Sequence, residues 1–514
     1  MEEPKDEISI LQFSDTHISE RPEFNPDAYE LAVDMINRSE ADYYIHTGDV
    51  TQEGTREDYT LARRLLSRIE KDVIYIIGNH DARNVGYELF DEFVGPTQPL
   101  YVDDRVLVAG FDTTIPDRND GRFGAKSLQE MRKLLREKGR GRTKIIAFHH
   151  HLIPVPRAGR ERSMIVDAGD VLECVLSYGV DLVLNGHRHS PNMFRVEDTV
   201  IVNSGTVSSH KTRAGDYHNF NSIRILPGES VDVKVLNVES KTLDEFSRSV
   251  KRASRLAGAS GDRIARIVQI SDTHFSNLPD FLGEAYEMSV NRINRLKPDL
   301  VVHCGDLTHD GLTDSYDIAT ERLAEISSPK IILPGPRDLL HLGHLLFRER
   351  IGELDPVFHG GDFHVYAINS SQFDEEDGRI GRTQIRELTE RISEAGDHSV
   401  KIVALHHHVL PLPHTREKFP IEDCGDVLAH LLENRVDMVL TGHRHIAHAY
   451  RIDDTVVVNA NTLSSRRYQA RYGNTFNLID ILSDGTAVIS EIGSLSGSRR
   501  ILGIYKLCSP LNAA

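Results

Sequence analysis

Histidine and carboxylate side chains recur in the first half of the chain as short motifs. In chain order, the motifs are Asp15-x-His17, Gly48-Asp49, Gly78-Asn79-His80-Asp81, the run His149-His150-His151, and Gly186-His187-x-His189. Together they offer carboxylate oxygens, imidazole nitrogens and one amide oxygen, without a thiolate. This ligand set suits borderline divalent cations such as Mn, Fe, Co or Zn. We therefore predict a metal centre in the first half of the chain.

Each motif closely follows an apolar run of strand length, and helical stretches separate the runs. ISILQF precedes Asp15, VIYIIG precedes Asn79 and KIIAF precedes His149, while DAYELAVDMINR is one of the helical stretches. This alternation predicts an α/β fold with a buried sheet, which places chemistry at the carboxyl ends of its strands. The i, i+2 spacing in DTH and HRH predicts two ligands on the same side of an extended backbone.

The same motifs return in the second half of the chain. LQFSDTHIS returns as VQISDTHFS, KIIAFHHHLIPVP as KIVALHHHVLPLP, and DLVLNGHRH as DMVLTGHRH. A repeat of this length is a duplicated domain rather than a solenoid unit. We expect domains at residues 1–240 and 263–514, joined by a linker at 241–262. Apolar residues at helical spacing in and beside the linker predict a short connecting helix there, namely Leu243, Phe246, Val250 and Ala257.

Length and composition fit this organisation. A chain of 514 residues exceeds the usual size of a single core, so two or more domains are expected. The formal net charge of −18 argues against bulk electrostatic binding to nucleic acid or to an anionic membrane. The four cysteines are scattered without a CxxC pair, the apolar runs are shorter than a membrane span, and the acidic start carries no secretory signal. We therefore expect a cytoplasmic protein.

The ordered and duplicated motif set resembles the calcineurin-like metallophosphoesterase superfamily. DxH, GD, GNHD, H and GHxH occur in that superfamily's order, and the resemblance covers nearly the whole chain, once per repeat. It is closest to the class III cyclic-nucleotide and glycerophosphodiester phosphodiesterases. The resemblance implies two tandem αββα sandwich domains, each with its site at one edge. It also implies a phosphoester hydrolase that uses two divalent metal ions.

The resemblance assigns roles to individual residues of the first repeat. The implied metal ligands are Asp15, His17 and His189 for one ion, Asn79, His149 and His187 for the other, and Asp49 as the bridge. His80 corresponds to the histidine that helps the leaving oxygen depart. Two cations about 3.5–4 Å apart lower the pKa of a bridging water and offset charge on the reacting oxygens. An imidazole beside them can donate a proton to an alkoxide.

Residues next to these motifs are candidates for substrate contact or for support. Of His150 and His151, we expect one to face the substrate, with His150 as the candidate, and the other to pack. Asp81 is predicted to orient a loop or a ligand rather than to bind metal. Lys211 and Arg213 lie in a basic loop after the GHRH motif and are candidates for holding a phosphate. The alternative for this loop is a solvated surface.

The second repeat keeps most of the ligand set but departs from it at one motif. Its partial metal set comprises Asp272, His274, Asp306, His406, His443 and His445. The counterpart of GNHD is Gly335-Pro336-Arg337-Asp338, so proline replaces the amide ligand and arginine replaces the titratable histidine. We predict a degenerate copy with a structural or regulatory role that binds at most one tight metal ion. The alternative is a harmless substitution with activity kept.

The motifs leave several functions open. The leading hypothesis is an enzyme that cleaves small phosphodiesters, with cyclic nucleotides or glycerophosphodiesters as candidate substrates. A phosphomonoesterase acting on nucleotides or phosphoproteins is an alternative, because the same metals serve both reactions. A non-catalytic, metal-stabilised sensor or scaffold is another, although it would have no need of His80. The acidic charge disfavours a nuclease. By analogy with dimeric relatives, the second repeat is expected to act as an internal partner, and further oligomerisation stays open.

Overall fold

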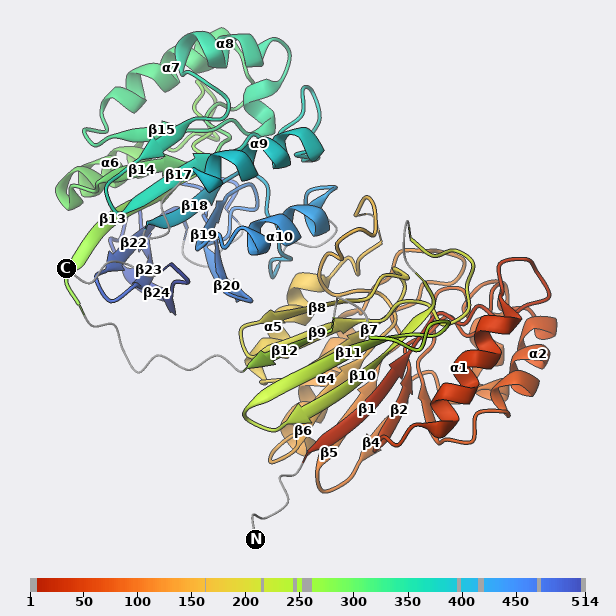
Figure 1. Cartoon of the computed structure of the whole chain (residues 1–514). Coiled ribbons are helices and arrows are strands. Elements are labelled where there is room, and N and C mark those ends of the chain that lie inside the picture. The colour runs from red at the N-terminus through yellow and green to blue at the C-terminus, as the bar shows by residue number, and fades with distance from the viewer. Residues whose placement is uncertain are drawn as a thin grey trace. The chain divides into compact units, whose positions relative to one another are not determined.

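The computed structural model describes residues 7–161, 163–213, 217–243, 247–251, 261–394, 399–414, 420–468 and 473–509. The chain divides close to residue 254 into two compact units, each with its own sheets and helices (Figure 1). Among the helices in the described ranges, none is long and apolar enough to cross a membrane.

The first sheet of the first unit has the strand order β12-β11-β10-β1-β2-β3. Its parallel half consists of β1 (Ile8–Phe13), β2 (Tyr43–His46) and β3 (Val73–Tyr75). On the other side of β1, antiparallel pairing adds β10 (Asn219–Leu226), β11 (Ser230–Asn237) and β12 (Arg248–Lys251). The parallel half is the part that carries the chemical motifs.

The second sheet of this unit runs in the order β4-β5-β6-β7-β9-β8. Four of its strands are parallel, namely β5 (Val106–Gly110), β6 (Thr143–Ala147), β7 (Leu182–Asn185) and β9 (Thr199–Asn203). Two more are antiparallel to their neighbours, namely β4 (Leu100–Val102) and β8 (Asn192–Val196). The strands after which the later motifs fall, β6 and β7, are therefore central in this half.

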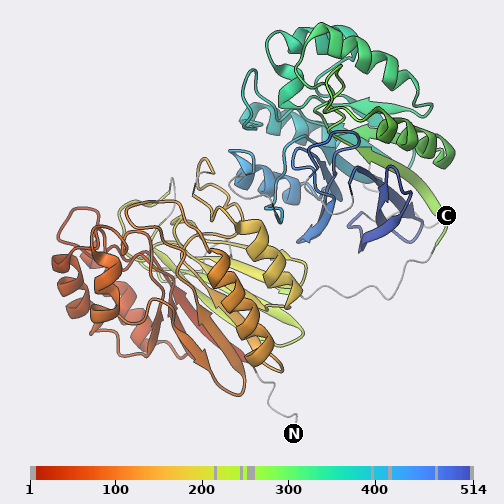
Figure 2. The same ribbon diagram turned by 180° about the vertical axis from the view of Figure 1, so that it is seen from behind.

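The two sheets pack face to face, and helices cover their outer faces. Ile10 and Ile45 of the first sheet meet Val108 and Leu184 of the second in one buried apolar cluster. On the outer face of the first sheet lie α1 (Pro26–Arg38), α2 (Arg56–Leu66) and α3 (Gly86–Phe93). Figure 2 shows α4 (Ala125–Lys138) and α5 (Ala168–Ser177), coloured orange and yellow, in front of the strands. The predicted αββα sandwich is confirmed.

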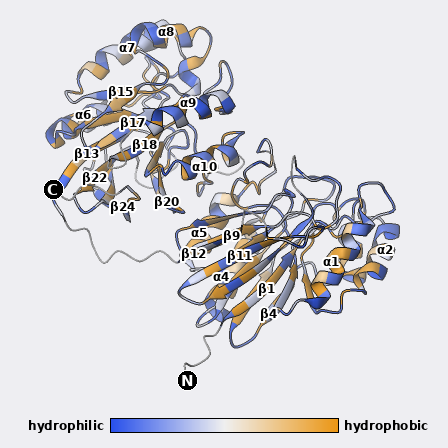
Figure 3. Cartoon of the chain, in the orientation of Figure 1, coloured by the Kyte–Doolittle hydropathy of each residue, from blue (hydrophilic) through white to orange (hydrophobic). Residues whose placement is uncertain are grey.

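Helix α1 illustrates how local sequence fixes an element beside the first motif. The side-chain oxygen of Asn25 accepts the Ala28 N–H at 3.1 Å, and Pro26 occupies the first helical position, where no donor is needed. Tyr29, Val33 and Ile36 recur at helical spacing on the buried face, and α1 carries both hydrophobic and hydrophilic segments (Figure 3). The cap thus defines where the loop that carries Asp15 and His17 ends and where the helix begins.

The second unit repeats this architecture. One sheet runs β15-β14-β13-β22-β23-β24 and comprises β13 (Arg263–Ile270), β14 (Leu300–His303), β15 (Lys330–Ile332), β22 (Thr475–Leu482), β23 (Thr486–Gly493) and β24 (Arg499–Lys506). The other runs β16-β17-β18-β19-β21-β20 and comprises β16 (Val357–His359), β17 (Phe363–Ala367), β18 (Val400–Ala404), β19 (Met438–Thr441), β20 (His448–Ile452) and β21 (Thr455–Asn459). The strand orders match those of the first unit, so the predicted tandem duplication is confirmed.

The helices of the second unit also correspond to those of the first. They are α6 (Gly283–Leu296), α7 (Thr313–Ala324), α8 (Gly343–Arg350), α9 (Arg382–Ser393) and α10 (Cys424–Glu433). One short 3-10 helix, η1 (Pro336–Leu339), begins at the proline that distinguishes the two repeats. Proline suits this first helical position because its missing N–H needs no partner there.

The predicted connecting helix is wrong where the structure describes that stretch. Residues 248–251 form β12, in which Val250 is opposite Val231 of β11 and is the buried residue of the strand. Leu243 makes an isolated antiparallel bridge with Leu236. Phe246 and Ala257 lie outside the described residues. The stretch therefore forms an edge strand paired with β11 instead of the helix that the apolar spacing predicts. The first unit accordingly extends past residue 240.

Candidate metal centre

The candidate site of the first unit lies at the carboxyl ends of parallel strands from both sheets. Its residues follow β1 (Asp15 and His17), β2 (Asp49), β3 (Asn79), β6 (His149) and β7 (His187 and His189). Parallel strands end at a common edge, so motifs that are distant in sequence meet there. All of these strands carry apolar side chains into the sandwich core, which holds the loops at their ends in register.

The backbone at the ligand positions is not extended, contrary to the expectation for DTH and HRH. Asp15 (φ 55°), His17 (φ 49°), His187 (φ 72°) and His189 (φ 53°) all adopt the left-handed conformation, and so does Asp49 (φ 55°). Each such residue costs about 1–2 kcal/mol relative to a right-handed one. The paired ligands therefore converge through tight left-handed turns, which their surroundings maintain, rather than through strand alternation.

Motif glycines make room for these turns. A Cβ added at Gly48 would lie 2.4 Å from Nδ1 of His149, and one at Gly78 would lie 2.2 Å from the backbone nitrogen of Asp49. At Gly186 an added Cβ would lie 2.2 Å from Oγ of Ser14. Any larger residue at these positions would displace a ligand or the loop that carries it.

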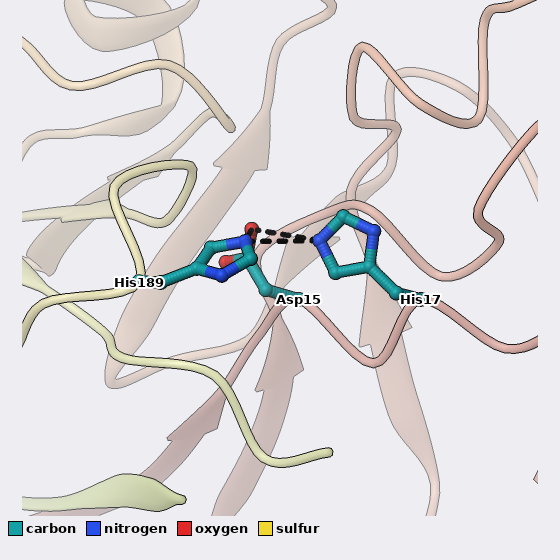
Figure 4. Close-up of side chains that lie close together, drawn as sticks. All are labelled: Asp15, His17 and His189. Atoms are coloured by element: carbon teal, nitrogen blue, oxygen red, sulfur yellow. Dashed lines mark hydrogen bonds and ion pairs between the residues drawn. The ribbon is translucent and has the colours of Figure 1, made fainter. Parts of the chain in front are cut away.

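One group of ligand atoms comes from Asp15, His17 and His189, which face one another in Figure 4. Nε2 of His189 lies 3.1 Å from Oδ1 of Asp15 and 2.9 Å from Nε2 of His17. Nε2 of His17 lies 3.7 Å from the same carboxylate oxygen. All three residues are buried.

A second group surrounds the amide oxygen of Asn79. Oδ1 of Asn79 lies 3.1 Å from Nε2 of His149 and 2.9 Å from Nδ1 of His187. Oδ2 of Asp49 lies 3.2 Å from Nε2 of His149 and 3.7 Å from Nε2 of His17, so its carboxylate reaches both groups. The structure thus brings together every residue predicted to hold metal in the first repeat.

The donor chemistry of these residues fits divalent cations. Nδ1 of His149 donates to the Thr47 carbonyl oxygen and Nδ1 of His189 to the Lys211 carbonyl oxygen, both at 2.7 Å, which turns each Nε2 towards the ligand groups. Within the described residues, Oδ1 of Asp15 is buried without a hydrogen-bond donor. Buried lone pairs that converge without donors between them are costly unless a cation satisfies them.

The electrostatics of the group point the same way. Burial alone would raise the pKa of Asp49, but the charge of His149 and its hydrogen bond to Asp49 outweigh burial and hold that pKa well below the usual range. Burial opposes protonation of His149, yet Asp49 outweighs burial and raises the pKa of His149 to about 9. The site therefore attracts positive charge, and a metal ion that binds His149 must displace a proton.

His80 lies beside the two ligand groups. The backbone N–H of His80 donates to Oδ1 of Asp49 at 2.8 Å. The His80 ring lies edge-on to the His17 ring, with the ring centroids 4.6 Å apart. Nδ1 of His80 donates to the Gln52 carbonyl oxygen at 2.7 Å, which leaves Nε2 with a lone pair. Burial lowers the pKa of His80 to about 3, so the imidazole is neutral before any substrate binds. An anionic phosphate beside this ring would raise that pKa.

Asp81 has the supporting place that the sequence predicts. It is buried, and its carboxylate accepts backbone N–H groups of Val50 at 3.0 Å, Thr51 at 2.7 Å and Gly78 at 3.0 Å. It thereby ties the loop after β2 to the loop after β3.

Asn119 and Arg83 are functional candidates that the motif analysis missed. Oδ1 of Asn119 accepts the Asn79 side-chain N–H at 3.3 Å, which turns the oxygen of Asn79 towards His149 and His187. Arg83 donates to the same Asn119 oxygen at 3.0 Å. Arg83 falls two residues after Asp81 and was visible as a cation next to GNHD, whereas no local pattern marks Asn119.

The four other predicted residues of the first unit differ in burial and in their contacts. His150 and His151 are both fully buried, and both pack beside His187, with centroid distances of 4.7 and 5.9 Å. The expected substrate contact of His150 therefore stays a prediction that its burial does not support. Lys211 is more than half exposed, with Nζ 4.0 Å from Glu23, whereas Arg213 donates through Nε to the Arg188 carbonyl oxygen at 3.1 Å.

The second unit brings its retained residues together in the same way. One group comprises Asp272, His274 and His445, and another comprises Asp306, His406 and His443. Nε2 of His445 lies 3.0 Å from Oδ1 of Asp272, while Nε2 of His406 is 3.8 Å from Oδ2 of Asp306. Nε of Arg337 lies 3.9 Å from the same Asp306 oxygen. The second group thus has a guanidinium beside it and no amide oxygen at position 336.

One protein-family model matches a segment of each unit. The calcineurin-like phosphoesterase family model matches residues 8–191 and 265–447. A protein named probable cyclic nucleotide phosphodiesterase from Vesicomyosocius okutanii is 23% identical over 231 residues, which are 44% of this chain and 97% of that protein. The 3',5'-cyclic adenosine monophosphate phosphodiesterase CpdA of Escherichia coli K12 is 26% identical over 197 residues, 36% of this chain and 68% of that protein. Among solved structures, purple acid phosphatase PPD1 from yellow lupin aligns with 57% of this chain and 60% of its own at 12% identity and a TM-score of 0.35.

Proposed function

Because the chain belongs to the calcineurin-like phosphoesterase family, we propose that its first unit hydrolyses small phosphodiesters at a centre of two divalent metal ions. Membership makes the protein a hydrolase of phosphoester bonds; the number of ions and the substrate are the proposal. The observation that carries it is the place of Asp49 between the two ligand groups, because its Oδ2 lies 3.2 Å from Nε2 of His149 in one group and 3.7 Å from Nε2 of His17 in the other. Ligands shared in this way support two neighbouring ions, Mn, Fe, Co or Zn by donor type.

The ligand assignment follows from the two groups. Asp15, His17 and His189 would hold one ion, and Asn79, His149 and His187 the other, with Asp49 between them. When bound, such a pair of ions lowers the pKa of a water between them and neutralises charge on the attacking and leaving oxygens. The protein's part is to hold the donors in place, and the ligand side chains are buried accordingly.

His80 is proposed as the proton donor to the leaving oxygen. Its Nδ1–H is committed to the Gln52 carbonyl oxygen, so only Nε2 is free to carry the transferred proton. Burial lowers the pKa of His80, and the negative charge of a phosphate beside the ring would raise it. Protonation and substrate binding are then coupled, which suits a general acid that acts only in the complex.

Charged side chains at the rim support a role in holding the phosphate. Lys211 is exposed and only loosely paired, so its ammonium can reach an anion, and Arg83 lies next to His80 and Asn119. Arg213, by contrast, is engaged with the Arg188 carbonyl oxygen and supports the loop that carries His187 and His189. We therefore retain Lys211 as a substrate-contact candidate, with Arg83 added to it.

Cyclic nucleotides are the first substrates to test, because proteins with this activity in their names are similar to 36–44% of the chain. A phosphomonoesterase is the alternative, since the same ions serve both reactions. A colour assay with bis-p-nitrophenyl phosphate and p-nitrophenyl phosphate, with added Mn²⁺, distinguishes the two. Faster release from the diester supports the proposal. Release from the monoester alone would overturn it, and release from neither would favour a sensor or scaffold.

The second unit is proposed to be degenerate, with at most one tightly bound ion. The loss of the amide oxygen at Pro336 and the guanidinium of Arg337 beside Asp306 support this view.

A cytoplasmic location also stays a proposal. It is compatible with the four cysteines, which all have free thiols in the part of the chain that the structure describes.

A further inference from the structure

The second unit retains one complete ligand group. Nε2 of His445 lies 3.0 Å from Oδ1 of Asp272 and 3.3 Å from Nε2 of His274. Nδ1 of His445 donates to the Arg467 carbonyl oxygen, just as Nδ1 of His189 donates to that of Lys211. The three residues are buried and keep the left-handed backbone of their counterparts. These donors fit one divalent cation by the same criteria as the first unit.

The neighbouring ligand group is altered by both substitutions in GPRD. Pro336 supplies no side-chain oxygen, and Nε2 of His406 lies directly against Nδ1 of His443 at 3.2 Å. The backbone N–H of Arg337 donates to Oδ1 of Asp306 at 3.0 Å, and its Nε lies 3.9 Å from Oδ2. A fixed cation therefore lies beside the carboxylate that would bridge two ions. Between a guanidinium and a nearby divalent ion the Coulomb energy is repulsive.

Further polar groups surround Arg337. Arg337 donates through Nη1 to the carbonyl oxygen of His309, and about a third of its side chain is exposed. His309 stands where the first repeat has Gln52, and Arg467 where it has Lys211. In the described part of the chain, Nδ1 of His309 is buried without a hydrogen-bond partner. A buried, unpartnered ring nitrogen on the residue that Arg337 contacts is a polar atom that a bound ligand could satisfy.

From this arrangement we propose that the second unit binds a phosphomonoester without hydrolysing it, between one metal ion held by Asp272, His274 and His445 and the guanidinium of Arg337. A guanidinium binds two phosphate oxygens through its parallel N–H groups. The metal ion held by Asp272, His274 and His445 would bind the third phosphate oxygen. Only a monoester has three terminal oxygens, so a diester would leave one of these partners unsatisfied.

The same residues explain why the ligand stays intact. Arg337 replaces the histidine that donates a proton in the proposed reaction of the first unit, and a guanidinium keeps its protons near neutral pH. Without the amide oxygen at position 336, the neighbouring group lacks a ligand for a second ion that would activate water. No phosphorus–oxygen bond breaks, and the unit acts as a receptor. Under the proposed function, its ligand belongs to the chemical class of the first unit's product.

Isothermal titration of the full chain with AMP tests the proposal. Asp15→Ala with Asp49→Ala removes the first unit's site, and the protein is saturated with Mn²⁺. We expect one AMP site per chain, at least tenfold weaker binding of cyclic AMP, and loss of AMP binding when the metal is chelated. Arg337→Met should weaken AMP binding at least tenfold. Arg350→Met is the matched control, because Arg350 is similarly exposed and pairs with Asp317 at 3.1 Å, and it should leave affinity unchanged.

The outcomes separate this proposal from simpler ones. Unchanged AMP affinity in Arg337→Met would reduce Arg337 to a structural partner of Asp306 and overturn the proposal. So would the absence of any AMP site in the protein with the first site removed, or the recovery of adenosine from bound AMP. Arg337→Lys keeps the charge but not the paired N–H groups, so its affinity should fall between the two, which covers the case in which Arg337→Met does not fold. Because the first site is disabled throughout, failure of its proposed activity has no bearing on the result.

Discussion

In the second unit, Nε2 of His406 lies 3.2 Å from Nδ1 of His443. In the first unit the equivalent nitrogens, of His149 and His187, are both within 3.1 Å of Oδ1 of Asn79. The amide oxygen of Asn79 thus has no counterpart at Pro336, although the two imidazole rings are equally close in both units, with centroids 5.1 Å apart in the first and 5.0 Å apart in the second. The consequences of this difference can be measured.

Metal content should be unequal between the units. We expect at most three tightly bound ions per chain, two in the first unit and one in the second, because Pro336 removes a ligand and Arg337 repels a second ion. Pro336→Asn with Arg337→His should raise the content towards four. Elemental analysis after dialysis measures this directly. Four tightly bound ions in the unmodified protein would mean that the second copy is not degenerate.

Activity should reside in the first unit. Asp15→Ala with Asp49→Ala removes a terminal and a shared ligand, so nearly all phosphodiesterase activity of the full chain should be lost. The matched pair, Asp272→Ala with Asp306→Ala, should leave most of it. Initial rates with bis-p-nitrophenyl phosphate at equal protein concentration give the comparison. Equal losses from the two pairs would contradict an inactive second unit.

His80→Ala should slow the reaction while leaving metal content nearly intact. If His80 protonates the leaving oxygen, the loss with a poor alkoxide leaving group should be roughly 10²–10⁴-fold. It should be much smaller with p-nitrophenolate, which departs without a proton. Rates for an alkyl and a nitrophenyl diester, together with metal analysis, test this. If both substrates lose rate equally, His80 positions the phosphate instead of donating a proton.

Acid should destabilise the protein through two buried histidines behind the sites. Burial lowers the pKa of His46 to about 3 and that of its counterpart His303 to about 4. Nδ1 of His46 accepts the Gly48 N–H at 3.2 Å, a bond that protonation would break. The unfolded chain takes up these protons below about pH 6.5, whereas the folded chain does not until about pH 3–4, so the free energy of unfolding falls as pH decreases across this window.

The expected slope is up to about 1.4 kcal/mol per pH unit for each histidine. Urea unfolding with a chelator present, at pH 7, 6 and 5, measures it without interference from metal loss. His46→Gln should flatten the dependence relative to the unmodified protein. An identical slope in this variant would show that His46 does not govern the acid response.

Much of this molecule was predictable because the repeat doubles every signal. Asp15 and Asp272, or His189 and His445, recur with the same neighbours, so the strand-and-loop frame around them could be inferred from the sequence before any contact was known. The αββα layers follow from that frame through the resemblance. The substitution at Pro336 could also be recognised from the sequence, because the first repeat has Asn79 at the equivalent position.

The remaining features depend on the conformation of loops and on contacts between distant residues, which short sequence motifs do not encode. β12 was missed because Val250 fits both a helical spacing and a strand whose single buried residue faces β11. In the run His149-His150-His151, only the fold decides which ring reaches the ligands. Asn119 joins the site from a distant loop without any motif. The left-handed backbone at Asp15 has no sequence signature, because the residue there is not glycine.

That left-handed backbone bears on how an ion arrives. It is present at five ligand positions in each unit, from Asp15 to His189 and from Asp272 to His445, and motif glycines allow the neighbouring loops to approach closely. The donors are therefore aimed at the ion before it enters, and no segment has to become ordered during capture. We expect uptake to be a single fast phase, paced by the departure of the ion's own water molecules rather than by rearrangement of the chain.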